Sequence, residues 1–169
     1  MNKPDTNEYA HFYSAYINKV DANNIQSELR STGNAFSAFL SSIPSELENY
    51  KYAEGKWTIK QVVQHIIDAE RVFAVRALRI SRNDQTNNPG FEENDYANEA
   101  TAEHRSLNDL KEEFGYVRNS NVLFFDALSN EDFVKTGIAN DSKISVRALA
   151  FIIVGHQLHH QQTLQERYL

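Results

Sequence analysis

The sequence predicts an all-α protein, and within that class a four-helix bundle. Proline and glycine are scarce, with 3 and 6 residues among 169, and runs of β-branched residues are short, which favours helices over sheet. Four long segments carry apolar residues at i, i+3 and i+4 intervals, the pattern of a helix with one buried face. Four such helices bury their apolar faces against one another in a bundle. The length is typical of one domain, so residues 1–169 are assigned to a single domain.

Residues 1–20 precede the first long helix and are predicted to form an N-terminal extension that packs on the bundle. The segment is polar and carries aromatic residues at helical spacing: Tyr9, Phe12, Tyr13 and Tyr16. This spacing predicts a short additional helix that lies across the domain.

The first long helix is predicted over residues 24–42. Its apolar stripe is Ile25, Leu29, Phe36, Phe39, Leu40 and Ile43. Pro44 ends it, because proline disfavours helical geometry in the residue that precedes it. The second long helix is predicted over residues 58–82, where Thr58 and Gln61 fit a capping box. Its apolar stripe is Ile59, Val62, Ile66, Ala69, Phe73, Ala77 and Ile80.

A long polar segment, residues 83–100, follows the second helix and contains a Pro-Gly pair. A loop of this length in a small domain is more often functional or lid-like than idle, and disorder is the alternative. Asp95 and Tyr96 in it are candidates to line a pocket. The third helix is predicted over residues 102–128, and Asn121 interrupts its stripe at a core position. The stripe is Leu107, Leu110, Phe114, Val117, Phe124, Phe125 and Leu128.

Residues 129–142 are predicted to be another connection, with Gly137 at a turn. The fourth helix is predicted to begin after Ser145, whose hydroxyl group is a good N-cap, and to end near Tyr168. Its inward stripe is Val146, Leu149, Ile152, Ile153, His156, His160 and Leu164.

The composition argues against several classes of protein. A formal net charge of −6 argues against a nucleic-acid partner, which requires a basic face. The longest apolar run, residues 148–155, is far shorter than the roughly 18 residues of a membrane span, and the N-terminus lacks the layout of a signal peptide. We therefore expect a cytoplasmic protein with no membrane partner. The chain has no cysteine, so a metal site must use His, Asp or Glu.

Three of the six histidines lie within residues 156–160, directly after the most apolar run. At 100° per residue, His160 lies roughly 40° from His156 around the helix, so both share its apolar face. Histidines at i and i+4 can converge on one metal ion, as the two histidines of an H-E-x-x-H motif do. His159 lies roughly 60° from His156, on the border of that face. It is the weaker candidate, and we expect it either to lie beside the ligands or to be partly exposed.

His65 lies on the second helix, about 90° from the centre of its apolar face. It can point toward a neighbouring helix as a third ligand, but its position does not require this. A single histidine on an apolar face is more often a core residue that binds a backbone carbonyl. Two buried imidazoles without partners would cost on the order of a few kcal/mol, whereas a shared metal ion satisfies both.

Two segments carry a family resemblance. Residues 57–71 (WTIKQVVQHIIDAER) and residues 155–160 (GHQLHH) resemble the second-helix signature and the fourth-helix H-x-x-x-H motif of the DinB-like (DinB/YfiT) superfamily, which is associated with metal-dependent enzymes. The two motifs occur in this order about 90 residues apart. The likeness extends over nearly the whole chain and includes the long loop, with its PGF and NDY segments.

The resemblance implies a four-helix bundle of the DinB/YfiT type, with long or irregular crossovers between the first two helices and between the last two. It also implies that His65, His156 and His160 bind one divalent metal ion, nickel or zinc. Three histidines leave coordination positions open, which is typical of catalytic sites, where the ion activates water or polarises a substrate oxygen. A thiol would have to arrive on a cosubstrate, as in the similar members that are low-molecular-weight-thiol transferases.

Charged residues of the second helix are candidates for supporting roles. Asp68 lies one turn from His65 and is the best candidate for a general base or for a hydrogen-bond acceptor behind that histidine. Four further charges are interpreted as solvent-exposed: Glu70 and Arg71 as a solvated pair, and Arg76 and Arg79 as exposed helix charges.

The leading hypothesis is a divalent-metal-binding protein that acts as a hydrolase or low-molecular-weight-thiol transferase on a small-molecule substrate. The main alternative is a metal-binding or stress-related bundle without turnover that acts as a dimer. A third is a metal-free bundle whose histidines serve packing. A solvent-accessible pocket at the metal would favour the enzyme. A fourth protein ligand, such as His159 or Asp68, would favour the binding role.

Overall fold

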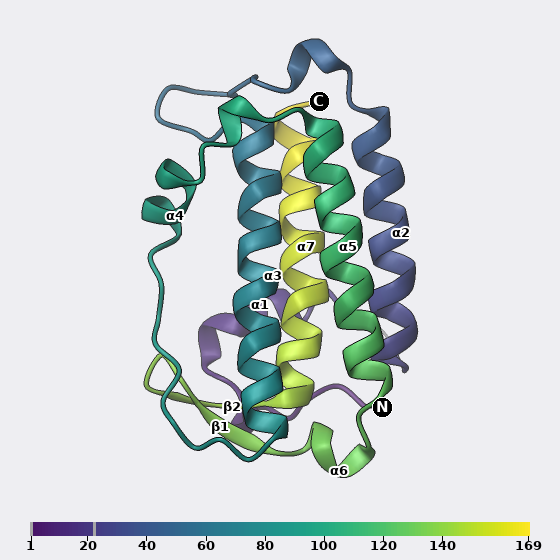
Figure 1. Ribbon diagram of the computed structural model, residues 1–169, viewed down its shortest axis with the longest axis vertical. Helices are drawn as coiled ribbons and strands as arrows, with labels where there is room; N and C mark the ends of the chain where they lie inside the picture. Colours follow the sequence, from purple (N-terminus) through teal and green to yellow (C-terminus); the bar gives the residue numbers. More distant parts are fainter. Residues whose placement is uncertain (1, 22) are drawn as a thin grey trace.

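The computed structural model of the protein describes residues 2–21 and 23–169. Four long helices lie side by side along its longest axis (Figure 1). They are α2 (Ile25–Ser42), α3 (Ile59–Ser81), α5 (Leu107–Asp126) and α7 (Val146–Arg167). The predicted all-α four-helix bundle is confirmed. The third long helix begins later than predicted because Ser106 and Asp109 form a capping box that starts it at Leu107.

The order of the helices around the bundle differs from their order in the chain. Helices α2 and α7 run in one direction and α3 and α5 in the other (Figure 1). The main contacts pair α3 with α7 and α5, and α2 with α5 and α7. Helices α2 and α3, and likewise α5 and α7, therefore lie diagonally opposite, so the connection within each of these pairs crosses an end of the bundle. These are the crossovers that the family resemblance implies.

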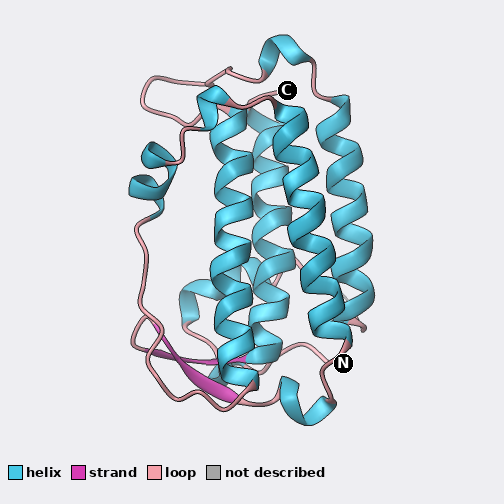
Figure 2. Cartoon of the chain, in the orientation of Figure 1, coloured by secondary structure: helices cyan, strands magenta, loops and turns pink. Residues whose placement is uncertain are grey.

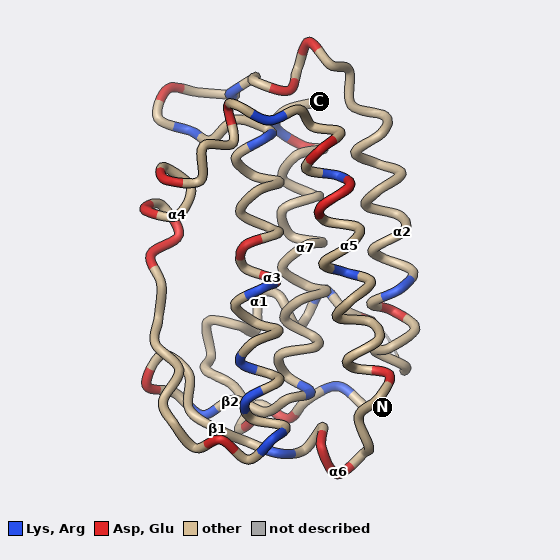
Figure 3. Tube along the Cα trace, viewed as in Figure 1, with Lys and Arg blue, Asp and Glu red and all other residues tan. Residues whose placement is uncertain are grey.

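The connection from α3 to α5 runs along the outside of the bundle from one end to the other (Figure 1). It contains the short helix α4 (Glu93–Glu99), which packs against α3 and was not predicted from the sequence. Residues 83–104 carry six acidic side chains and no Lys or Arg. The lower half of α3 in Figure 3 is rich in Lys and Arg, so opposite charges lie on these two segments.

A β-hairpin and a short helix connect α5 to α7 at the end of the bundle opposite the C-terminus (Figure 2). They are α6 (Asn130–Phe133), β1 (Thr136–Ala139) and β2 (Ser142–Ser145). The predicted turn at Gly137 is wrong, because Gly137 lies within β1 and pairs with β2. The turn is instead at Asn140 and Asp141, whose φ angles of 49° and 57° suit a two-residue hairpin.

The N-terminal segment lies along α7, from its beginning to beyond its middle. It forms two 3₁₀ turns (Thr6–Glu8 and His11–Tyr13) and the four-residue helix α1 (Ser14–Ile17), so regular α-helix is shorter here than the aromatic spacing predicted. Contacts of α1 with α7 hold the segment on the bundle. Glu8 fixes its beginning, because it accepts hydrogen bonds from Ser145 at 2.7 Å and from Arg147.

The apolar core is in two parts along the bundle. One part gathers around Phe73, Phe125 and Phe151, and the other around Phe36, Ile66 and Phe114. Buried polar side chains of all four helices pack alongside these apolar residues: Thr32, His65, Glu70, Arg118, Asn121, His156 and Gln157. In the described part of the chain, no helix is long and apolar enough to span a membrane.

Gly155 allows α1 to cross α7 at close range. A Cβ atom at this position would lie 2.1 Å from the carbonyl oxygen of Tyr16, so the backbone of α1 would have to move. We expect Gly155→Ala to lower the free energy of unfolding by about 1–3 kcal/mol, because the added methyl group overpacks a backbone contact. Urea unfolding measures this change.

Gly115→Ala on α5 is the matched control, since a Cβ atom there meets nothing within 4 Å. It is expected to be neutral or to stabilise by up to about 1 kcal/mol through helix propensity. Equal stabilities of the two variants would show that α1 does not need Gly155.

Candidate metal centre

Three histidines from two neighbouring helices meet inside the bundle and form the histidine cluster: His65 of α3, and His156 and His160 of α7. The Nε2 atom of His156 lies 3.0 Å from that of His65 and 3.2 Å from that of His160. One nitrogen from each ring falls within 4.8 Å of the others. The structure therefore brings together the three residues that the sequence singled out, although they are up to 95 positions apart.

The helix caps set this arrangement. Thr58 and Gln61 form the predicted capping box at the start of α3, and the Ser145 side chain accepts a hydrogen bond from the Ala148 amide at the start of α7. Each cap fixes the register of its helix, and the i, i+4 spacing of α7 stacks His156 and His160 on adjacent turns.

Aromatic side chains surround the histidine cluster. The Trp57 ring centroid lies 4.9 Å from that of His65, while those of Tyr16 and Phe73 lie 5.2 and 5.8 Å from His156. The sequence did not identify these contacts. Phe73 was on a predicted inward stripe, but Tyr16 meets His156 only because α1 crosses α7, which no local pattern encodes.

The three imidazoles are held in the neutral form. Burial lowers the pKa of His65 to about 4. Burial, with the neighbouring His65 and His159, lowers the pKa of His160 to about 3. Burial also holds the pKa of His156 well below its usual range, and the other histidines add to this effect. Neutral imidazole nitrogens have the free lone pairs that metal ligands require.

Two of the three separations in the histidine cluster match the ligand spacing of a divalent ion. Metal–nitrogen bonds of ~2.0–2.1 Å at tetrahedral or octahedral angles separate two ligand nitrogens by roughly 2.8–3.4 Å. The two close separations, 3.0 and 3.2 Å, agree with this range. Hydrogen bonds satisfy the cluster less well, because His156 Nε2 is shared by two neighbours and has either one hydrogen or one lone pair.

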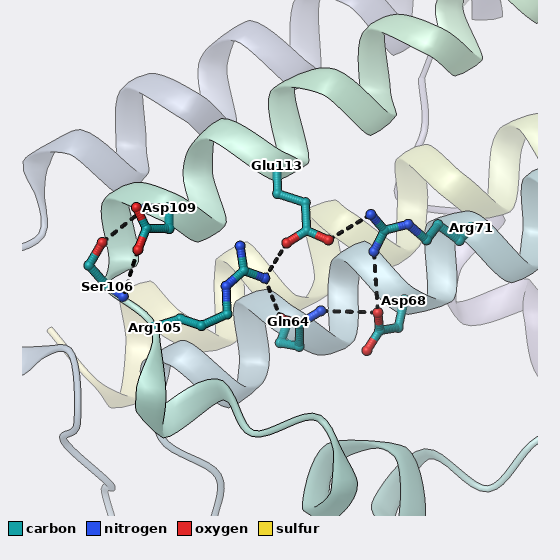
Figure 4. Close-up of polar contacts among 7 residues, drawn as sticks. All are labelled: Gln64, Asp68, Arg71, Arg105, Ser106, Asp109 and Glu113. Atoms are coloured by element: carbon teal, nitrogen blue, oxygen red, sulfur yellow. Dashed lines mark hydrogen bonds and ion pairs between the residues drawn. The ribbon is translucent and has the colours of Figure 1, made fainter.

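Asp68 is not brought to the histidine cluster. Its carboxylate accepts a hydrogen bond from Gln64 at 3.0 Å and lies 3.6 Å from Arg71, in a chain of polar contacts that continues through Glu113 to Arg105 (Figure 4). Burial raises its pKa, against the effect of Gln64 and Arg71. Its role as a base stays a prediction that none of these contacts supports.

Asp95 and Tyr96 line a surface hollow beside Asp68 and Arg71. The histidines do not contribute to this hollow. The two loop residues therefore line a pocket, but not the one predicted to hold the chemistry.

Two of the charges interpreted as solvent-exposed are buried. Glu70 is 2% exposed and pairs with Arg118 of α5. Arg76 is 3% exposed and donates a hydrogen bond to the Pro89 carbonyl at 2.6 Å. The interpretation failed because both positions face neighbouring segments that the helix pattern does not reveal.

Arg71 and Arg79 are closer to the prediction. The Arg71 side chain is 47% exposed, but its partners are Glu113 and Asp68 and not Glu70. The Arg79 side chain is 30% exposed and pairs with Asp84 at 2.7 Å.

Two hollows reach the histidine cluster from different sides. The first, which we call the aromatic cavity, has a volume of about 200 Å³ and contains His65 and His156 in its wall. The second, the outer groove, has a volume of about 340 Å³ and is lined by His159 and His160 together with Trp57. His159 therefore lies beside the cluster and not in it, as helical phase predicted. Both hollows give small molecules access to the histidines.

A four-helix bundle with three inward histidines beside two hollows defines a class of protein able to bind a metal ion. The sequence model of the DinB superfamily matches residues 28–164, and the chain belongs to this superfamily. The family resemblance drawn from residues 57–71 and 155–160 is thereby confirmed. No curated protein matches the sequence.

Solved structures share the fold at low sequence identity. YfiT from Bacillus subtilis, a probable metal-dependent hydrolase with an unusual four-helix bundle topology, is 14% identical with a TM-score of 0.76 over 98% of this chain and 90% of its own. The DinB-like protein YjoA from Bacillus subtilis is 22% identical with a TM-score of 0.60 over 85% and 87% of the two chains. A protein from Streptococcus pneumoniae is 14% identical with a TM-score of 0.67 over 94% and 100%.

Proposed function

We propose that the protein is a metal-dependent enzyme, either a hydrolase or a low-molecular-weight-thiol transferase, whose ion is nickel or zinc. The observation that carries the proposal is the convergence of the Nε2 atoms of His65, His156 and His160 beside two solvent-accessible hollows. The likeness to YfiT, a probable metal-dependent hydrolase, supports the same function. The substrate is a small molecule, and a thiol, where one reacts, is a cosubstrate because the chain has no cysteine.

The three histidines would hold the ion, and the remaining coordination positions would face the hollows. A divalent ion in such a site supplies Lewis acidity, which polarises a substrate oxygen or lowers the pKa of water. The aromatic rings of Tyr16, Trp57 and Phe73 pack against the imidazoles, and this burial keeps the imidazoles neutral. No described carboxylate joins the histidine cluster as a fourth ligand, which supports the enzyme over a closed binding site.

Metal binding is the first test. We expect the purified protein to bind about one Ni²⁺ or Zn²⁺ per chain, and His65→Ala and His156→Ala to weaken binding by at least about 10–100-fold, since loss of a ligand costs no less than loss of its supporting contacts. Elemental analysis gives the content, and titration of chelator-treated protein gives the affinity. His159→Ala is the matched control, because this histidine lies next to the cluster and is expected to be dispensable.

Equal and weak binding by the wild type and both ligand variants would refute the proposed site. Turnover is tested on the metal-loaded protein with chromogenic esters for hydrolysis, and with cysteine and an electrophilic aryl chloride for thiol transfer. Tight metal binding without acceleration of either reaction would favour the non-catalytic alternative, a metal-binding bundle that acts as a dimer.

A further inference from the structure

The aromatic cavity contains one buried cation that the proposed metal site does not use. Its wall includes Arg76 of α3, together with aromatic side chains from the N-terminal segment, α3 and the long loop. The aromatic residues are Phe12, Tyr13, Tyr16, Phe73 and Phe91. The cavity is smaller than the ~300–1,000 Å³ of sites for drug-sized ligands, which limits it to a small molecule.

Arg76 has no carboxylate partner within the described residues, unlike its neighbours on α3. Arg71 lies 2.6 Å from Glu113, and Arg79 lies 2.7 Å from Asp84. Arg76 as a whole is 3% exposed, and its guanidinium donates to the carbonyl oxygen of Pro89 and lies 6.0 Å from the Phe73 ring centroid. The Tyr13 hydroxyl group also interacts with this guanidinium. A guanidinium has five N–H donors, so the carbonyl and the hydroxyl group leave others available.

A buried charge without a counter-ion is unfavourable, and an anion in the cavity would remove this cost. One anionic side chain, that of Glu93, also lines the cavity. Glu93 is exposed and makes no ion pair with Arg76. Arg76 is therefore a fixed cation that faces a small cavity, with its charge open to a ligand.

Phe73 lies between the two ends of the cavity. Its ring lies 5.8 Å from that of His156 and 6.0 Å from the Arg76 guanidinium carbon, so the cation and the histidine cluster flank one aromatic ring. A ligand that spans the cavity would place an anionic group at Arg76, an apolar body along Phe73 and its other end at His65 and His156. Aromatic walls favour a flat apolar body.

We infer that Arg76 is the anion-binding residue of the aromatic cavity, and that the substrate class is small organic anions with an apolar body. Only the identity of the reacting end rests on the proposed function, because the cation and the aromatic walls are independent of a metal ion. The anionic group is a carboxylate or a phosphate, both of which a guanidinium binds through paired hydrogen bonds.

The test uses chelator-treated protein, so that a metal ion cannot contribute. Titration calorimetry compares benzoate with benzamide, which has a similar shape and no charge, and with phenyl phosphate. We expect at least one of the two anions to bind about tenfold or more tightly than benzamide, since a charge-assisted hydrogen bond is worth more than a neutral one. The tighter of benzoate and phenyl phosphate identifies the anionic group.

Arg76→Gln is expected to abolish the preference for the anion, and Arg76→Lys to keep it in part. The control is Arg79→Gln, which makes the same charge change one turn along α3, outside this cavity, and should leave the preference intact. If Arg76→Gln does not fold, nuclear magnetic resonance of the wild type provides the test. The Nε–H resonance of Arg76 should shift with the preferred anion and not with benzamide.

Three results would overturn the inference. They are equal affinities for anions and benzamide, a preference that survives Arg76→Gln, and anion binding that is absent after chelation and returns with Zn²⁺. The last would mean that the anion binds the metal ion and not Arg76. Failure of metal binding alone leaves this test unchanged, so the two proposals can fail separately.

Discussion

Acidification from about pH 7.5 to about pH 5 is expected to destabilise the chelator-treated protein, and the buried histidines should account for most of the loss. The pKa of His65 is lowered to about 4 and that of His160 to about 3, both mainly by burial. Histidine in an unfolded chain has a pKa near 6.5. The folded and unfolded states therefore bind different numbers of protons between these values.

The sign of the effect follows from this difference. Above about pH 6.5 both states are neutral at these histidines, and the free energy of unfolding does not depend on their protonation. Below about pH 6.5 the histidines of the unfolded chain bind protons, whereas those of the folded chain stay neutral. Stability then falls by roughly 1.4 kcal/mol per pH unit for each such histidine, until the pH reaches the folded pKa.

Urea unfolding at a series of pH values measures this slope. His160→Gln should make it shallower, because glutamine does not titrate. His104→Gln is the control: its side chain is 78% exposed, so the slope should equal that of the wild type. Glu8 and Glu113 do not interfere above about pH 5. Burial raises the pKa of each carboxyl group, but the hydrogen bonds and nearby arginine charges together outweigh it and lower the pKa of both. An unchanged slope in His160→Gln would contradict burial of a neutral imidazole.

Local patterns were sufficient for the bundle and for two thirds of the histidine cluster. The capping residues Thr58 and Ser145 and the apolar stripes predicted the long helices, and a 3.6-residue period placed His156 and His160 on one inward face. His65 is different. Its helical phase left it at the edge of the buried face, and only the packing of α3 against α7, or the family resemblance, directs it to the cluster.

The residues that the sequence interpretation missed depend on contacts between distant segments. Arg76 is the clearest case: eleven positions separate it from His65, which places it only about 20° away around the helix. Helical phase alone could therefore have put it on the histidine face. Its burial could not be predicted, because the Pro89 carbonyl that covers it belongs to a loop. The hairpin was missed because each strand has four residues.

The positions of Glu70 and Asn121 in the helical pattern also indicate burial. Glu70 lies four residues after Ile66 and three before Phe73, both of them core residues, so helical spacing places it inward. Asn121 interrupts an apolar stripe for the same reason. The Asn121 side chain donates a hydrogen bond to Glu70 at 3.1 Å. Polar residues that occupy core positions in the patterns of two different helices therefore belong to one buried network.

Breaking the ion pair of this network is expected to be the most damaging single change in the bundle. Arg118 donates two hydrogen bonds of 2.8 Å to the two carboxylate oxygens of Glu70, and both residues are 2% exposed. Its Nη1 group donates to the Leu29 carbonyl at 3.1 Å, the Thr32 hydroxyl group at 3.2 Å and the Gln157 side chain at 3.4 Å. One guanidinium therefore connects α2, α3, α5 and α7.

Arg118→Met should lower the free energy of unfolding by about 3–5 kcal/mol, because it leaves the Glu70 carboxylate buried without a counter-ion. The double variant with Glu70→Leu should recover much of this loss, since an apolar pair avoids the cost of desolvating two charges. Urea unfolding of the wild type, both single variants and the double variant forms a double-mutant cycle, which gives the coupling energy of the pair.

The surface pair Arg30–Asp126 is the matched control, with a 2.6 Å contact and side chains that are 55% and 37% exposed. Arg30→Met should cost less than about 1 kcal/mol. If Arg118→Met costs no more than this, the buried pair does not hold the bundle together. Gln157 follows His156 directly on α7, so its bond to Arg118 also restrains the rotation that directs His156 and His160 inward. We therefore expect the double variant to fold but to bind Zn²⁺ more weakly than the wild type.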